Sequence, residues 1–284
     1  MSKLAPILKL APIFMILIIT TFLAWGVSRP ASLLTTSSGI ILATTTSLYD
    51  SGLLDQLLFA FEKHAGIRVK PIAVGTGEAL KLGQKGEADL LLVHAPELEN
   101  QFMAYGYGLR REELMTSEFV LVGPADDPAK VKGLSFPQAL SKIAQSKAFF
   151  VSRGDNSGTH FLEERVWKEV GFKPAGKWYL QTGQGMAETL FIGSEKQAYL
   201  LTDYPTYARL KPVLKLKILC RDENYLNVYS VILVKTKNNQ GQREAAERLL
   251  EYLLSPEAKQ IIVAFGRKNN ETEGLFRVIQ PHEK

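Results

Sequence analysis

Cysteine, histidine and clustered basic residues are all scarce in this sequence, and each shortage excludes a class of function. Cys220 is the only cysteine among 284 residues, so no disulfide can form within the chain. With one cysteine and four histidines, the sequence shows no cluster at metal-ligand spacing and permits no assignment of a Ser/His/Asp triad. The lysines and arginines are scattered rather than gathered with aromatics on one face, which argues against nucleic-acid binding.

Nucleotide-binding and esterase signatures are missing as well. The glycine-rich strings Gly75–Gly77 and Gly183–Gly185 match neither the dinucleotide fingerprint nor a Walker loop, because Gly-Lys-Ser/Thr is absent. Ser157 lies one residue out of register for a nucleophile elbow. We therefore expect no cofactor, no metal-cation site and no catalytic residue. An enzyme that acts on a phosphorylated or sulfated metabolite remains the alternative.

The long hydrophobic run lies at the N-terminus. Lys3 and Lys9 precede an apolar stretch over residues 10–27, which is the pattern of a secretory signal peptide. The stretch is also about long enough to remain as a membrane anchor. We predict a signal peptide or uncleaved anchor over residues 1–28 and a polar tether over residues 29–38. The protein is then periplasmic or secreted, or a membrane-tethered sensor domain if residues 10–27 are retained.

From Gly39 onward, strand-like and helix-like segments alternate, which predicts an α/β fold. A chain of this length, with 46% hydrophobic residues, suits one large or two medium domains. The expected strands are Ile40–Ala43, Ile67–Val74, Ala88–Val93, Phe119–Val122, Phe149–Val151, Trp178–Leu180, Ala198–Leu201, Leu216–Leu219 and Val228–Val234. The expected helices include one capped by Asp50 or Ser51 and ended by Gly66, one from Glu78, and Phe161–Val170, Gln242–Leu254 and Pro256–Phe265.

Polar or glycine-rich clusters follow several of these strands. They are Thr44–Ser47, Gly75–Gly77, Ser152–Thr159 and Gly183–Gly185. Each cluster alone is more often a helix cap or a turn than a ligand site. Ligands of open α/β sheets bind at the carboxyl ends of strands, so the shared position of the four clusters predicts one site there.

The most informative cluster reads SRGDNSGTH, Ser152–His160. It places Arg153, Asp155 and two hydroxyls around Gly158 at the start of a predicted helix. The first turn of a helix carries free N–H groups and a partial positive charge, and the arginine adds a planar fork of donors. This combination predicts a site for a tetrahedral oxyanion, although an ordinary N-cap with a surface ion pair would also fit the string alone.

Seven runs together resemble the tungstate-binding proteins of ABC importers. They are ATTTS (Ala43–Ser47), AVGTGEALKLG (Ala73–Gly83), ADLLLVHAPELE (Ala88–Glu99), YGYG (Tyr105–Gly108), FVLVGPADDPAKVKG (Phe119–Gly133), FVSRGDNSGTH (Phe150–His160) and GQGMAETL (Gly183–Leu190). The resemblance extends from about Ala43 to Tyr207. It implies a two-lobed periplasmic-binding-protein-like (type II) fold with a hinge crossed twice, and a solute receptor rather than an enzyme.

The resemblance also implies partners, domains and site residues. The partner would be an ABC transporter permease, and the receptor would be a monomer. Lobe one would comprise residues 35–117 and 228–284, and lobe two residues 118–227. The family motifs imply oxyanion ligation, and our full candidate set is Thr45, Thr46, Ser47, Thr76, Arg153, Ser157, Gly158 and Thr159. Asp155 would hold the Arg153 guanidinium in place rather than touch the ligand.

The same arginine–serine–threonine motif is similar to that of phosphate-binding proteins, so the anion itself needs an argument. Phosphate keeps a proton at neutral pH and needs an acceptor, whereas tungstate, molybdate and sulfate need only donors. In phosphate binders a carboxylate follows the strand that corresponds to Ala88–Val93. Here that position is His94, which counts against phosphate. Tungstate is the ligand that the resemblance implies, with molybdate and sulfate as alternatives that charge alone does not separate.

Overall fold

The computed structural model describes residues 39–267 and 274–279, so the predicted leader and tether lie outside the described residues. The strands are β1 (Ile40–Thr45), β2 (Val69–Val74), β3 (Leu90–Val93), β4 (Gly108–Pro124), β5 (Phe150–Ser152), β6 (Tyr179–Gln181), β7 (Leu200–Asp203), β8 (Leu216–Val234) and β9 (Arg277–Val278). The helices are α1 (Thr46–Ser51), α2 (Leu53–Ala65), α3 (Thr76–Lys85), α4 (Pro96–Ala104), α5 (Phe136–Ser146), α6 (Gly158–Glu169), α7 (Met186–Lys196), α8 (Tyr204–Leu210), α9 (Gln240–Leu254) and α10 (Pro256–Ala264).

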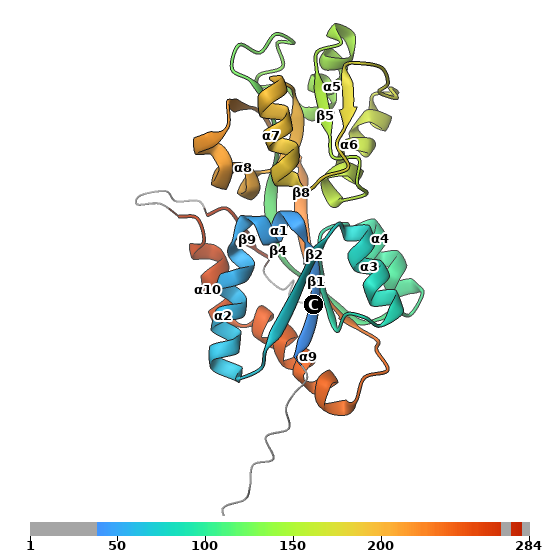
Figure 1. Ribbon diagram of the computed structural model, residues 1–284, viewed down its shortest axis with the longest axis vertical. Helices are drawn as coiled ribbons and strands as arrows, with labels where there is room; N and C mark the ends of the chain where they lie inside the picture. Colours follow the sequence, from blue (N-terminus) through green and yellow to red (C-terminus); the bar gives the residue numbers. More distant parts are fainter. Residues whose placement is uncertain (1–38, 268–273, 280–284) are drawn as a thin grey trace, which may run out of the picture. The chain divides into compact units, whose positions relative to one another are not determined.

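The main sheet is mixed, with the order β2-β1-β3-β8-β4-β7 and β9 paired to β4 (Figure 1). Its β2-β1-β3 portion is parallel, whereas β3-β8, β8-β4 and β4-β7 pair antiparallel. Strands β5 and β6 pair parallel in a separate small sheet. The predicted α/β class is confirmed.

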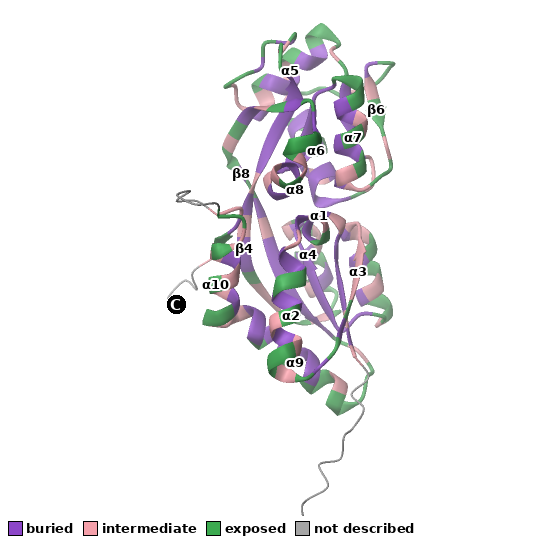
Figure 2. Cartoon of the chain, turned by 60° about the vertical axis from the view of Figure 1, so that its left-hand side comes forward, coloured by how far each residue is buried: buried purple, intermediate pink, exposed green. Residues whose placement is uncertain are grey.

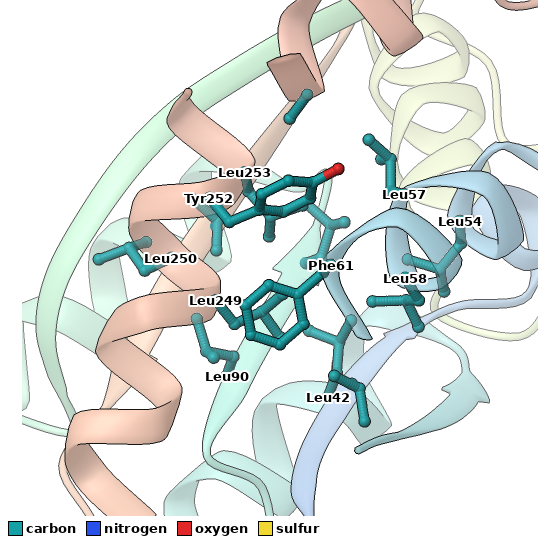
Figure 3. Packing of buried hydrophobic residues seen from close by; sticks show 14 of the residues in the cluster. Leu42, Leu54, Leu57, Leu58, Phe61, Leu90, Leu249, Leu250, Tyr252 and Leu253 are labelled. Atoms are coloured by element: carbon teal, nitrogen blue, oxygen red, sulfur yellow. The ribbon is translucent and has the colours of Figure 1, made fainter. Parts of the chain in front are cut away.

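Side chains that alternate between the two faces of β1 pack into two hydrophobic layers, one on each face of the sheet. In β1, Ile40 and Leu42 pack with α2, α9 and α10, whereas Ala43, on the opposite face, packs with α3 and α4. Strand side chains point alternately to opposite faces, so a strand buried on both faces reads as a continuous apolar run. Figure 3 shows Phe61 of α2 and Tyr252 of α9 meeting over Leu42, with their ring centroids 5.4 Å apart. We call these two layers together the first core.

The same pattern recurs between β4 and β8 further along both strands. Phe119 and Leu121 pack with α5 and α6, whereas Val120 and Val122 pack with α7 and α8. We call these layers the second core. Strands β4 and β8 contribute to both cores, and Figure 2 shows long buried stretches along each of them.

The length of β4 and β8 contradicts the sequence-based expectation. We expected a short strand Phe119–Val122 and two separate strands, Leu216–Leu219 and Val228–Val234, but the structure has strands of 17 and 19 residues. The added segments carry many charged residues. In the structure Arg221 of β8 pairs with Glu118 of β4, and Arg110 pairs with Glu112 along β4. Bulges interrupt the register between the two strands.

The start of the first helices differs as well. The sequence predicted a cap at Asp50 or Ser51, but the short helix α1 already begins at Thr46 with Thr45 as its N-cap. Gly52, in the left-handed conformation at φ 85°, then separates α1 from α2. A left-handed residue ends a helix without steric cost only when it is glycine. The shift places the Thr-Thr-Ser segment on a helix N-terminus rather than in a loop.

Two single features complete the description of the fold. Cys220 is buried, and its thiol lies 3.0 Å from the carbonyl oxygen of Val131. Burial raises the pKa of this thiol to about 11, so it behaves as a small apolar residue. Within residues 39–267 and 274–279, no helix is long and apolar enough to cross a membrane.

Candidate functional site

The four polar clusters singled out in the sequence meet at one place. A methyl group on Gly75 would lie 3.3 Å from the carbonyl oxygen of Asp155, so the turn after β2 touches the turn after β5. A methyl on Gly185 would lie 3.7 Å from the Thr46 hydroxyl, which brings the turn before α7 to the start of α1. The clusters come from both cores, and their shared position at strand ends was a correct guide to their convergence.

Arg153 is the charged centre of this place. Its side chain is only 2% exposed, and its Nη2 donates to Asp155 Oδ2 at 2.6 Å and to the Thr46 hydroxyl at 3.2 Å. Its Nε and Nη1 find no hydrogen-bond partner among the described residues. The arginine is therefore held in position by Asp155 while two donor groups stay available to a ligand.

The first turn of α6 presents further donors beside Arg153. Ser157 is the N-cap, and its hydroxyl accepts from the His160 N–H at 3.3 Å, which leaves its own proton free to be donated. Asp155 Oδ1 accepts from the Ser157 N–H at 3.2 Å and fixes the entry into the helix. The Thr159 hydroxyl is buried and has no partner in the described part of the chain. Gly158 contributes its N–H as the first helical residue.

The first core supplies hydroxyls from α1 and α3. Thr45 caps α1 by accepting from the Leu48 N–H, and its hydroxyl lies 3.3 Å from that of Ser47. Thr76 is the first residue of α3, and its buried hydroxyl has no partner within the described ranges. The site therefore contains first turns of helices from both cores.

His94, the residue in the position that argued against phosphate, lies beneath these hydroxyls. Its Nε2 is 3.2 Å from the Ser47 hydroxyl. Burial, together with the nearby charge of Arg153, lowers the pKa of His94 to about 3, so the imidazole is neutral. A serine–histidine pair could suggest a nucleophile and its base. A histidine with this pKa is a weak base, and no carboxylate accepts a hydrogen bond from its ring among the described residues, so the pair lacks the third member of a Ser/His/Asp triad.

Sequence reasoning missed Asp203 and Thr206. The Thr206 hydroxyl lies 3.3 Å from the Ser47 carbonyl oxygen and 2.7 Å from Asp203 Oδ1, so α8 reaches α1. Asp203 is fully buried, and its electrostatic interaction with Arg153 favours the charged form, but burial prevails and raises its pKa to about 6. Asp203 is therefore a second carboxyl, besides Asp155, on which the charge of Arg153 acts. Asp203 ends β7, so the rule that selected the other clusters would also have found it.

The candidate site residues fall into two groups: those with direct contacts to one another, and those that are unpaired or begin α6. Direct contacts connect Thr45 with Ser47, and Thr46 with Arg153 and Asp155 through the guanidinium. Thr76 and Thr159 are buried hydroxyls without partners, and Ser157 and Gly158 begin α6. Their role as ligands remains a prediction. No group of three or more acidic, histidine or cysteine side chains that could hold a metal ion occurs in the described residues.

This geometry favours an acceptor-rich anion. Each unpaired buried donor costs about 1–3 kcal/mol relative to a paired one. Arg153 Nε and Nη1 and the hydroxyls of Thr76 and Thr159 together form a set of such donors from both cores. A tetrahedral oxyanion carries oxygens in several directions and can pair with donors from both cores at once.

Comparisons with known proteins agree with this chemistry. A family model described as a PBP superfamily domain matches residues 30–257. The tungstate-binding protein TupA of Peptoclostridium acidaminophilum is 46% identical over 235 residues, which cover 81% of this chain and 82% of that protein. A solved structure of the tungstate ABC transporter from Geobacter sulfurreducens is 42% identical, with a TM-score of 0.73, and covers 79% of this chain and 97% of that one. The tungstate-binding protein TupA from Desulfovibrio alaskensis G20 is 41% identical, with a TM-score of 0.68 and coverage of 84% and 98%.

Proposed function

Because this chain belongs to the PBP superfamily and, within it, to the TupA family of tungstate-binding proteins, we propose that it captures tungstate outside the cytoplasm and delivers it to an ABC importer. Its relatives are named as transport and binding proteins rather than as enzymes. The partner is the membrane permease of that importer. The proposed binding function requires no nucleotide, metal cation or other cofactor in the receptor itself.

One observation carries the proposal: segments of two separately packed cores each carry buried donors without partners, and the turns beside these segments touch at Gly75 and Asp155. Arg153 and Thr159 belong to the turn and helix that follow β5, whereas Thr76 belongs to α3. A site built on one core alone would need donors from that core only, either Arg153 and Thr159 or Thr76. Donors from both sides favour an anion that is enclosed rather than bound at a surface.

We propose that the two cores are two lobes that close over the anion, with β4 and β8 as the hinge. The proposed boundaries are residues 117/118 in β4 and 227/228 in β8. Met115 and Tyr229 pack in the first core, whereas Phe119 and Tyr225 pack in the second, which supports boundaries at these points. At the crossing, the Asn227 side-chain amide donates to the Ser117 hydroxyl at 3.3 Å.

The first test is the choice of anion. We expect the order of affinity to be tungstate, molybdate, sulfate and then phosphate. The unpaired donors suit a fully deprotonated dianion, and the longer bonds of tungstate reach donors on both lobes, whereas sulfate is smaller. Hydrogen phosphate carries a proton, and an O–H left without an acceptor costs about 1–3 kcal/mol. Titration calorimetry of the mature chain with each sodium salt near pH 7 measures the order.

Comparing the four anions separates two hypotheses: the identity of the ligand and the existence of an oxyanion site. If phosphate binds as tightly as tungstate, the ligand assignment is wrong although an oxyanion receptor remains. If none of the four anions binds, the receptor assignment itself fails. Chloride at equal ionic strength serves as the control for unspecific charge effects.

The second test is closure. Only a closed state satisfies donors from both lobes, so tungstate should shift the population toward a more compact form. Small-angle X-ray scattering with and without tungstate should show a smaller radius of gyration in the presence of the anion. An unchanged radius at saturating tungstate would contradict the clamp while leaving the binding site intact.

A further inference from the structure

Asp203 is a fully buried carboxyl that the anion-binding proposal does not use. It ends β7 and caps α8, where its Oδ1 accepts from the Thr206 N–H at 2.9 Å and from the Thr206 hydroxyl at 2.7 Å. Its Oδ2 has no hydrogen-bond partner among the described residues. A buried carboxylate oxygen without a donor is costly, so the group needs a reason to be there.

The surroundings of Asp203 connect it to the anion site. Thr206, which Asp203 holds, lies against the Ser47 carbonyl oxygen of α1, and α1 carries the threonine and serine hydroxyls of the candidate cradle. Among the described residues, the charge of Arg153, in the turn after β5, acts on Asp203, and the charge of Asp203 acts on Tyr229, on β8. Burial and the Asp203 charge keep the pKa of Tyr229 well above its usual range, so Tyr229 stays neutral. Arg153 is therefore the nearby charge that favours the ionised carboxyl.

A bound dianion would change this balance. Arg153 is also the principal charged donor for the anion, so an oxyanion beside it offsets the field that now stabilises the Asp203 carboxylate. The anion adds repulsion of its own within a site that excludes water. Both effects favour the neutral form of Asp203 when the anion is bound.

We propose that Asp203 is the proton-linked residue of this receptor, which takes up a proton from solvent onto Oδ2 when a fully deprotonated oxyanion binds beside Arg153. The inference rests on the proposed anion-binding function. Asp203 acts through charge and does not itself contact the anion.

The linkage fixes the sign of the pH dependence. In the free receptor the pKa of Asp203 is raised to about 6, so the carboxyl is mostly ionised at pH 7.5. Anion binding raises this pKa further, so binding takes up protons and affinity falls as pH rises above about 6. The loss approaches tenfold per pH unit while the pH lies between the free and bound pKa values.

The experiment measures proton uptake directly. Tungstate is titrated into the wild-type receptor at pH 7.5 in Tris, triethanolamine and bicine, which carry no competing tetrahedral oxyanion and differ in ionisation enthalpy. The dependence of the observed heat on that enthalpy gives the number of protons taken up. We expect at least half a proton per tungstate in the wild type and less than a fifth in D203N.

Asparagine is the appropriate substitution because it keeps an Oδ1 acceptor and is itself a good N-cap. At pH 8.5, D203N should bind tungstate at least threefold more tightly than the wild type, because the repelling charge is gone. A purely structural role for Asp203 predicts the opposite change. Thermal melting followed by circular dichroism verifies that the variant is folded.

Glu163 provides the matched control. It is also a buried carboxyl, on α6, where its Oε1 accepts from Trp167 Nε1 at 3.1 Å and from the Tyr179 hydroxyl at 2.7 Å. Burial raises its pKa to about 7. E163Q should retain the proton uptake of the wild type.

Three results would overturn the inference: heats independent of the buffer in the wild type, unchanged uptake in D203N, or loss of uptake in E163Q. The wild-type measurement needs no variant, so the inference stays testable even if D203N does not fold. An absence of any tungstate binding by the wild type would instead reject the proposed function.

Discussion

Replacing Arg153 with alanine should raise the Kd for tungstate roughly 100-fold or more, the largest effect we expect from a single side chain. Arg153 is almost fully buried and keeps two donor nitrogens without partners. Removing one partner of a buried charge interaction costs about 2–5 kcal/mol, partly because groups such as Asp155 lose their counter-charge. Titration calorimetry measures the change in Kd.

Lysine is the informative second substitution at this position. It restores the positive charge but not the planar fork, because an ammonium cannot donate to Asp155 and to the anion in the fixed directions of a guanidinium. We expect R153K to recover only part of the lost affinity. If R153A changed the Kd by less than about tenfold, equivalent to about 1.4 kcal/mol, Arg153 would not contact the ligand.

Replacing Gly158 with alanine should weaken tungstate binding roughly 10- to 100-fold although it removes no donor. A methyl group there would lie 2.5 Å from the His94 carbonyl oxygen and 2.4 Å from His94 Nδ1. The carbonyl belongs to the backbone and cannot rotate away, so α6 must move from the segment after β3. Such overpacking costs about 1–3 kcal/mol. Calorimetry measures the affinity, and scattering should show a smaller ligand-induced compaction.

Gly77→Ala is the matched control for this prediction. Gly77 also lies in the first turn of a helix at the meeting of the clusters, but a methyl there would approach Asn156 no closer than 3.7 Å, an ordinary contact. We expect its Kd to stay within a factor of about three of the wild type. Because alanine favours helix over glycine, G77A should not lower the melting temperature of the ligand-free protein, whereas overpacking should lower that of G158A. Equal affinities for G158A and G77A would refute the proposed close approach.

The sequence predicted the α/β class, the positions of most elements and the convergence of the polar clusters. These features depend on local patterns: apolar runs, glycine stops and polar residues at strand ends. Gly66, for example, ends α2 as predicted, in the left-handed conformation that glycine adopts readily. The error in the length of β4 concerns a segment whose local signal was overridden by strand pairing. The charged stretch between Gly108 and Glu118 forms part of β4 because β8 pairs with it and its charges find partners.

The sequence by itself determined the chemistry of the site, because Arg153, the hydroxyls and the helix starts are written in short local motifs. Only the tertiary structure decided which of these groups keep a free donor and which are consumed by capping, as Ser157 is in part. It also decided that Asp203 lies in the field of Arg153 and that α6 leaves no room for a methyl group against His94. These relations join residues far apart in the chain, and their energies depend on distance and burial. No local pattern contains either quantity.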